Sequence, residues 1–213
     1  WNPVEELKLE QNGGETKLLD WDATVKLNLL PLLAKDGHSI HSLSTQLTFA
    51  DQQSDNFDYW FRPSTSRLAM KNDYKGEASR TYSKYRQHSL EWLGNYAMEL
   101  KGHRARAMVG YSYQYFQNSG LNAANKDFSS DGLLYNNLGS GEWAKEEGRN
   151  EMGTNKSDSK LIAFFGRLSY DYKNRYLMTA SLRYEGSSRF GDDNKWGYFP
   201  AVSAGWRISE EAF

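Results

Sequence analysis

Residues 161–213 decide the fold, and they read LIAFFGRLSYDYKNRYLMTASLRYEGSSRFGDDNKWGYFPAVSAGWRISEEAF. Two runs of alternation open the stretch, with apolar or aromatic side chains recurring at even positions between 162 and 172 and again between 176 and 184. Only Lys173-Asn174-Arg175 separates the two runs. Because successive side chains of a strand point to opposite faces, this pattern predicts a β-hairpin with one apolar and one polar face. A helix would scatter the same residues around its axis.

The second half of the stretch carries a more specific signal. It reads RYEGSSRFG at 183–191, NKWGYFP at 194–200 and VSAGWRISEE at 202–211. This run resembles the barrel region of the SusC/RagA family of TonB-dependent outer-membrane transporters, in which a hairpin ends in an R-x-D-G-S-S-R-F-G loop. Glu185 replaces the family's usual Asp, and Ala201 replaces a frequent Ser. The loop and strand residues that carry the motif are Gly186, Ser187, Ser188, Arg189, Phe190, Gly191, Trp196, Gly197, Phe199, Pro200, Gly205 and Trp206.

The resemblance implies an all-β fold, namely the wall of an antiparallel transmembrane β-barrel with long extracellular loops. This chain would supply about seven or eight strands of a larger barrel of about 22. Residues 1–213 would form one segment of the barrel domain, with the strongest match at 161–213, and the plug domain would lie outside this chain.

The resemblance also implies a function and partners. It implies import of nutrients, either oligosaccharides or peptides, across the outer membrane of a Gram-negative bacterium, together with a SusD-like surface lipoprotein. The TonB complex would act through parts outside this chain, and the barrel wall would contact outer-membrane lipid or lipopolysaccharide. It implies neither enzymatic activity nor a cofactor.

Composition is compatible with this interpretation. Aromatic residues make up 15% of the chain, including 14 Tyr and 7 Trp. A membrane barrel presents only every second residue to lipid and concentrates Tyr and Trp at the two water–lipid borders. The formal net charge of -1 argues against a nucleic-acid partner held by phosphate contacts. The absence of cysteine excludes a disulfide framework and a thiolate metal site.

The lengths of the connections provide a second, independent signal. Outer-membrane barrels have short periplasmic turns and longer extracellular loops, and from residue 31 onward the connections of this chain alternate between short and long. We expect strands before, between and after these connections, seven in all, plus a short strand at 4–10 that ends in a turn at 12–14. The predicted periplasmic turns are 31–37, 101–104 and 173–175, and the predicted outward loops are 51–83, 118–159 and 186–198.

Two other interpretations remain open. Eight strands can close a small barrel, so the chain could be a complete eight-stranded outer-membrane adhesin or structural anchor. It could also be a soluble carbohydrate-binding β domain rich in Tyr. The opening residues WNPVEE lack the basic start and apolar run of a signal peptide, and the family pattern continues beyond residue 213. We therefore expect a central segment of a larger barrel wall.

Candidate contact residues lie in the predicted outward loops. Aromatic rings stack on sugar rings and peptide side chains, so the aromatic residues of these loops are candidates for contact with the ligand or a partner. The alternative is that their rings pack the loops together or touch a neighbouring subunit. The four histidines, at 38, 41, 88 and 103, lack metal-site spacing, so we expect solvated histidines and no metal site. Arg189 is expected to anchor its loop to an inward carboxylate. The candidate contacts are Tyr59, Trp60, Phe61, Tyr74, Tyr135 and Trp143.

Overall fold

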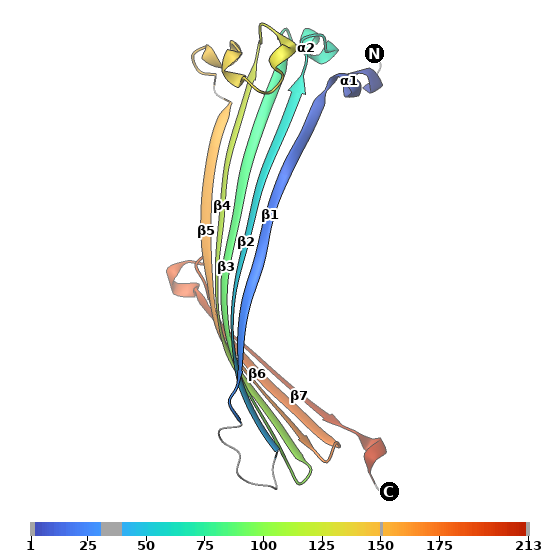
Figure 1. Ribbon diagram of the computed structural model, residues 1–213, viewed down its shortest axis with the longest axis vertical. Helices are drawn as coiled ribbons and strands as arrows, with labels where there is room; N and C mark the ends of the chain where they lie inside the picture. The colour runs from blue at the N-terminus through green and yellow to red at the C-terminus, as the bar shows by residue number, and fades with distance from the viewer. Residues whose placement is uncertain (1–2, 31–39, 150, 212–213) are drawn as a thin grey trace. The chain divides into compact units, whose positions relative to one another are not determined.

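The computed structural model describes residues 3–30, 40–149 and 151–211. Seven strands form one sheet in the order β1-β2-β3-β4-β5-β6-β7, so each strand lies beside its neighbour in the sequence (Figure 1). This confirms the predicted all-β fold. The strands are β1 (Gln11–Asn28), β2 (Ile40–Arg62), β3 (Glu77–Leu100), β4 (His103–Lys126), β5 (Met152–Tyr172), β6 (Tyr176–Ser187) and β7 (Trp196–Trp206), and the α-helices are α1 (Pro3–Leu9) and α2 (Arg67–Lys71).

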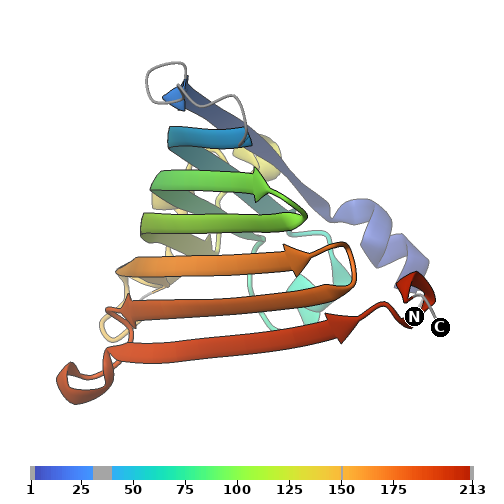
Figure 2. The ribbon, with the colours of Figure 1, turned by 90° about the horizontal axis from the view of Figure 1, so that it is seen from below.

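The chain divides into two compact units, which are considered separately. The loop unit comprises Trp1–Leu19, Gln52–Arg86 and Gln117–Asp158. The wall unit comprises Asp20–Asp51, Gln87–Phe116 and Ser159–Phe213. Figure 2 shows the wall unit's strands side by side, with β1 and β7 at the two edges of the sheet. Within the described residues these edges do not pair with each other, so the seven strands form an open sheet and not the closed eight-stranded barrel.

The predicted start of the chain is wrong. Residues 4–9 belong to α1, and the expected turn at 12–14 lies inside β1. The sequence EELKL consists of good helix formers. The two glycines serve close packing instead of a turn: a Cβ added at Gly13 would lie 2.5 Å from the Tyr59 hydroxyl of β2, and one at Gly14 would lie 2.4 Å from the Asp58 carboxylate.

The outward connections are shorter than predicted. Strand β2 continues to Arg62 and β3 begins at Glu77, so the first connection spans 63–76, and the second and third span 127–151 and 188–195. The strand ends are polar on both faces, so their pairing leaves no period-2 apolar pattern in the sequence. The short turns at 101–104 and 173–175 are confirmed, whereas the turn at 31–37 lies outside the described residues.

The hairpin of β5 and β6 and the next strand, β7, have one apolar face. In the antiparallel register Tyr172 faces Tyr176, which in turn faces Trp206, and their rings form a row with centroids 6.4 and 6.5 Å apart. At the opposite ends of these strands, the ring of Tyr184 stacks on Trp196 at 4.6 Å and on Tyr198 at 4.4 Å. We call these two sets the turn-side row and the loop-side row.

The separation of the two aromatic rows fits a bilayer. Tyr176 and Tyr184 are eight positions apart in β6, or about 27 Å along a strand at about 3.4 Å per residue. At the usual barrel tilt of about 40°, this distance corresponds to a depth of about 21 Å across the membrane. The apolar band between the aromatic girdles of outer-membrane barrels has a similar height of about 25 Å.

The residues between the rows are left uncovered by this chain. Met178 is 52% exposed, Leu182 49% and Val202 72%. Among the described hydrophobic residues of the wall unit, only Ala163 is buried. A soluble domain rarely leaves so large an apolar surface exposed to water, and this argues against the soluble carbohydrate-binding interpretation. No described helix is both long enough and apolar enough to span a membrane.

The family motif is explained by packing at the β6–β7 loop. Gly186 is buried opposite Trp196, and a Cβ at this glycine would lie 2.6 Å from the indole ring, whereas Gly191 has open space around it. Ser188 holds the loop to β5, because its backbone N–H donates to the Lys160 carbonyl and its Oγ accepts from the Lys160 N–H, at 2.9 and 2.8 Å. Arg189 donates to the hydroxyl of Ser159 at 3.2 Å, so its predicted carboxylate partner was wrong.

The end of the motif is held together by Glu211. Its carboxylate accepts hydrogen bonds from the Trp206 indole at 3.0 Å and the Tyr176 hydroxyl at 2.8 Å, and it pairs with Arg175 at 3.0 Å. Hydrogen bonding from Trp206 and Tyr176, together with the charge of Arg175, lowers the pKa of Glu211 despite desolvation. The Ser-Glu-Glu motif therefore ties the end of β7 to the turn before β6.

Substitution of the two motif glycines by alanine is expected to have different effects. Gly186→Ala places a methyl group against the indole of Trp196 and should lower the free energy of unfolding by about 1–3 kcal/mol, as overpacking does. Gly191→Ala, the matched control, should leave it within about 0.5 kcal/mol. Denaturant unfolding of the detergent-extracted whole protein measures both, and equal effects of the two substitutions would contradict the packing explanation.

Glu211 should make stability depend on pH. Because its folded-state pKa is lowered, its contribution is present above the ordinary glutamate pKa of about 4.3 and is lost as the pH falls through the lower folded value. Glu211→Gln should therefore reduce the midpoint of thermal unfolding at pH 6 and reduce it less at pH 3. Glu210→Gln, at the exposed neighbouring position, is the control. An equal loss at both pH values would rule out the carboxylate as the cause.

Candidate functional site

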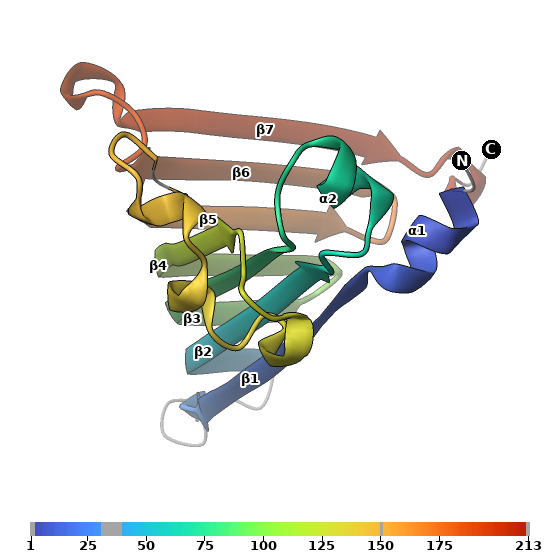
Figure 3. The same ribbon diagram turned by 90° about the horizontal axis from the view of Figure 1, so that it is seen from above.

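The six predicted contact aromatics all lie in the loop unit, where the structure divides them into two groups. Figure 3 shows α1, α2 and the outward connections at the ends of β1–β5. Because neighbouring residues of a strand point to opposite faces, Phe61 and Arg62 of β2 belong to different faces. One face is apolar and covered by the 127–151 connection, and the other carries charged side chains. The first group is Tyr59, Phe61 and Tyr135, and the second is Trp60, Tyr74 and Trp143.

The first group packs the connection onto the strands. Phe61 is 2% exposed and forms a buried cluster with Ala78 and Phe128, against which Tyr135 packs. The rings of Tyr59 and Tyr135 stack with centroids 3.8 Å apart. Desolvation, followed by the hydrogen bond with Tyr59, raises the pKa of Tyr135. These contacts agree with the alternative expectation that the aromatic residues hold the loops together, and the buried ring of Phe61 is closed to ligand in this conformation.

The second group lies along five charges of alternating sign, which we call the charged row: Glu10, Arg62, Glu77, Lys126 and Glu151. Arg62 lies 2.6 Å from Glu10 and 3.2 Å from Glu77, and Lys126 lies 3.4 Å from both Glu77 and Glu151. The row thus links the start of β1 to β2, β3, β4 and the residue preceding β5. Networks of this kind stabilise more than separate surface pairs because each of the three inner charges has two partners.

Three aromatic residues contact the cations of the charged row. The guanidinium of Arg62 lies 4.6 Å from the centroid of the Trp60 ring and donates to the Tyr74 hydroxyl at 2.9 Å. The Lys126 ammonium lies 5.5 Å from the ring of Tyr74 and 5.1 Å from that of Trp143. These are cation–π distances, so contacts with Arg62 and Lys126 hold each ring beside the charged row.

The charges of the row hold both cations in their protonated forms. Burial lowers the pKa of Arg62, but hydrogen bonds with Glu10 and Tyr74 outweigh it, so the pKa rises. Burial likewise lowers the pKa of Lys126, but the charges of Glu77 and Glu151 raise it further. Arg62 and Lys126 therefore stay charged throughout the physiological pH range.

The connections on which the site rests are fixed by polar side chains that the sequence pattern did not single out. Asp131 accepts from the backbone N–H of Ser64 at 3.0 Å and from its hydroxyl at 2.8 Å, which joins the two connections. Asn125 donates to the carbonyls of Leu138 and Gly141 and accepts from the Ala144 N–H. Asn and Asp are common in turns, but their spacing gave no indication of these distant partners.

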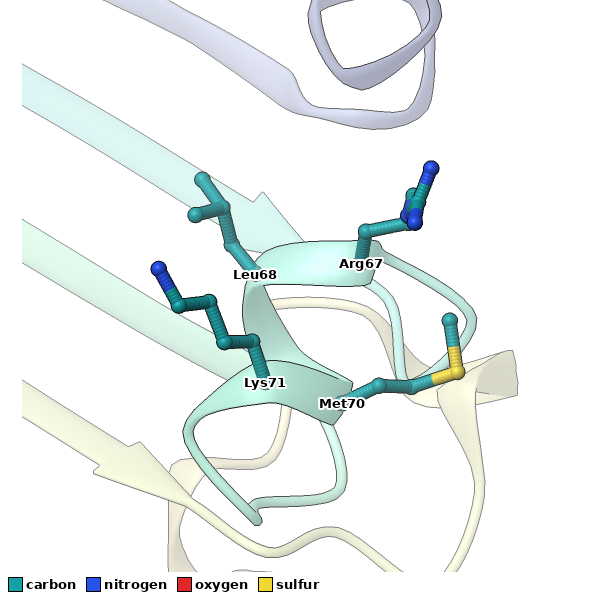
Figure 4. A pocket seen from close by; sticks show the side chains of 4 residues that line it. All are labelled: Arg67, Leu68, Met70 and Lys71. Atoms are coloured by element: carbon teal, nitrogen blue, oxygen red, sulfur yellow. The ribbon is translucent and has the colours of Figure 1, made fainter. Parts of the chain in front are cut away.

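Helix α2 borders a separate hollow. A cavity of about 580 Å³ is lined, among the described residues, by Arg67, Leu68, Met70 and Lys71 (Figure 4). Ser66 caps the helix by accepting from the backbone N–H groups of Leu68 and Ala69. The lining mixes basic and apolar side chains, and it contains none of the six predicted aromatic residues.

The described histidines have polar partners. His41 and His103 lie at the starts of β2 and β4, as expected of strand-end histidines, and the His88 side chain is 42% exposed. The Nδ1 atoms of His41 and His103 lie 2.8 and 2.6 Å from the hydroxyls of Tyr96 and Tyr170, and His88 pairs with Asp51. His38 lies outside the described residues. Within the described ranges, no group of three or more His, Cys, Asp or Glu residues is arranged to hold a metal ion.

Removing the central cation should loosen the loop unit. Arg62→Ala leaves Glu10 and Glu77 partly buried without this cation, which should cost about 2 kcal/mol, less than a fully buried broken pair. Chymotryptic cleavage within 127–151 should then accelerate about 30-fold if cleavage follows local opening. Arg62→Lys should fall between, because an ammonium cannot reproduce the guanidinium's several directed hydrogen bonds. Lys75→Ala, at an exposed position, is the control; cleavage of Arg62→Ala at the wild-type rate would show that the row does not hold the loops.

The chain has clear relatives. It is 41% identical over 114 residues to the TonB-dependent receptor P39 of Formosa agariphila, which covers 52% of this chain and 10% of that protein. It is 55% identical over 53 residues to the TonB-dependent receptor SusC of Bacteroides thetaiotaomicron, covering 25% of this chain and 5% of that protein. The chain thus spans a tenth or less of the length of these two relatives.

Solved structures show the same fold. The RagAB peptide transporter superposes with a TM-score of 0.67 at 18% identity, over 92% of this chain and 20% of that one. The RagAB peptide importer in its closed-closed state gives a TM-score of 0.70 at 17% identity, over 97% of this chain and 22% of that one. The family described as TonB dependent receptor-like, beta-barrel matches residues 7–212. The chain therefore belongs to the TonB-dependent receptor family and forms part of its β-barrel.

Proposed function

We propose that this chain forms part of the wall and outer loops of a TonB-dependent transporter in the outer membrane of a Gram-negative bacterium. The observation that carries the proposal is the apolar face of the wall unit, which lies between two aromatic rows a bilayer's apolar depth apart. The opposite face of the same strands holds polar pairs such as Arg104 with Asp171 at 3.0 Å. A face for lipid and a face for water or protein are what a barrel wall requires.

We further propose that the transported substrate is an oligosaccharide or a peptide delivered with a SusD-like lipoprotein. Likeness to SusC and to the RagAB peptide transporter supports this. Energy from the TonB complex would enter through parts of the protein outside this chain, and lipid or lipopolysaccharide would cover the apolar face.

Within the loop unit, the charged row is the proposed region of ligand or partner contact. It places Trp60, Tyr74 and Trp143 together with carboxylates and cations on a single face. Indole and phenol rings stack on sugars and on peptide side chains, and the charges can pair with peptide termini or with sugar hydroxyls. The guanidinium of Arg149 also lies 5.1 Å from the centroid of the Trp143 ring. By contrast, Tyr59, Phe61 and Tyr135 serve packing.

Extraction of the native polypeptide in mild detergent tests the proposal. Peptides from residues 161–213 identify the protein, and intact mass and co-purifying proteins are measured. We expect a mass several times the 24.5 kDa of this chain and a bound surface lipoprotein. A polypeptide near 24.5 kDa without a lipoprotein would overturn the transporter proposal and favour a small adhesin or anchor. A large protein recovered only from the soluble fraction would overturn the membrane location.

A further inference from the structure

The two described short turns of the wall unit lie against each other and both carry a lysine. The backbone N–H of Lys173 donates to the carbonyl of Gly102 at 2.6 Å, which joins the β5–β6 turn to the β3–β4 turn. A Cβ at Gly102 would lie 3.1 Å from Cγ of Lys173. Figure 2 shows the ends of these hairpins side by side. The lysine of the first turn is Lys101, and both lysines are exposed.

Turn geometry does not account for these lysines. Lys101 has φ 48° and Lys173 has φ 52°, both in the left-handed region. Positions of short hairpin turns that need positive φ prefer Asn, Asp or Gly, because a longer side chain gains nothing there and its Cβ crowds the backbone. Gly102 and Asn174, at φ 86° and 60°, follow that preference. A lysine in the less favourable position of both turns therefore suggests a role for its charge.

The ammonium of Lys173 lies at the aromatic border of the apolar face. It is 5.2 Å from the ring centroid of Tyr172, a member of the turn-side row. The imidazole of His103 lies 4.5 Å from the same ring and shares a 2.6 Å hydrogen bond with the Tyr170 hydroxyl. Cationic, phenolic and imidazole groups thus gather where Tyr and Trp residues meet the headgroups of a bilayer.

Three other cations beside these turns have polar partners. Arg104 binds Asp171 at 3.0 Å, Arg175 binds Glu211 at 3.0 Å, and Arg207 donates to the side-chain oxygen of Asn174 at 2.6 Å. Across residues 3–30, 40–149 and 151–211, no carboxylate lies within 4.0 Å of the Lys101 or Lys173 ammonium. Among the described residues, the ammonium groups of Lys101 and Lys173 therefore have no ion-pair partner.

We propose that Lys101 and Lys173 bind the phosphodiester of an anionic phospholipid in the periplasm-facing leaflet. The lipid's acyl chains would run along the apolar face, and the ammonium groups would pair with its phosphate, a contact that anionic lipid surfaces favour for basic residues. The position of Lys173 over a border tyrosine favours a membrane lipid over a soluble anion, which would need no adjoining apolar face. This inference rests on the proposed outer-membrane placement.

Native mass spectrometry of the whole protein, delipidated in detergent, tests the site. The protein is offered equal amounts of phosphatidylglycerol and phosphatidylcholine, and retained molecules are counted. Lys101→Asn with Lys173→Asn removes both charges and installs a residue that positive φ favours, so the turns should fold at least as well. Lys75→Asn with Lys145→Asn, in the loop unit, removes the same charge elsewhere.

We expect wild-type protein and the loop-unit variant to retain phosphatidylglycerol about tenfold over phosphatidylcholine, and the turn variant to retain the two equally. A preference of the turn variant equal to that of wild type would overturn the site, as would displacement of phosphatidylglycerol by an equal concentration of glycerol phosphate. Failure of the membrane placement differs from both outcomes, because the wild-type protein would then retain neither lipid.

Discussion

A single β-sheet has no second layer, so its apolar face needs a cover that its own chain does not provide. Every feature of the wall unit follows from this constraint. Hydrophobic side chains between the aromatic rows stay largely exposed. Among the described hydrophobic residues of the wall unit, Ala163 alone is buried. Backbone hydrogen bonds between consecutive strands hold the sheet together, and in the proposed membrane placement a bilayer covers the apolar face. The stability of the wall unit therefore depends on what covers its apolar face.

The loop unit is stabilised by contacts within its own residues. It has a small apolar cluster around Phe61 on one face and an ionic network on the other. Neither face resembles the interior of a globular domain, and each relies on residues drawn from distant parts of the sequence. Side-chain hydrogen bonds from Asn125 and Asp131 then satisfy backbone groups of the connections that no sheet neighbour reaches. Together these contacts give the outer connections a defined conformation.

The sequence predicts a strand correctly where one face of that strand is apolar, and it gives no signal where both faces are polar. The hairpin at 161–185 was predictable because apolar and polar residues alternate along it. Residues 51–62 form strand as well, but a run such as DQQSDN is polar on both faces and carries no period. The contact residues show the same limit. Their aromatic character singled out Trp60 and Phe61, yet adjacent positions lie on opposite faces, and only the register of β2 against its neighbours separates a ring on the charged row from one in the buried cluster. Arg62 and Lys126 give no sequence signal because their partners lie up to 52 positions away.

Sharing of Glu77 has a mechanical consequence. This one carboxylate binds both Arg62, at the start of the 63–76 connection, and Lys126, at the start of the 127–151 connection. For either connection to swing alone, one of the two cations must give up this carboxylate while it remains partly buried, and desolvation makes that costly. Glu77 thus holds together the strand ends from which both outer connections start, and the placement of their first residues depends on this one carboxylate.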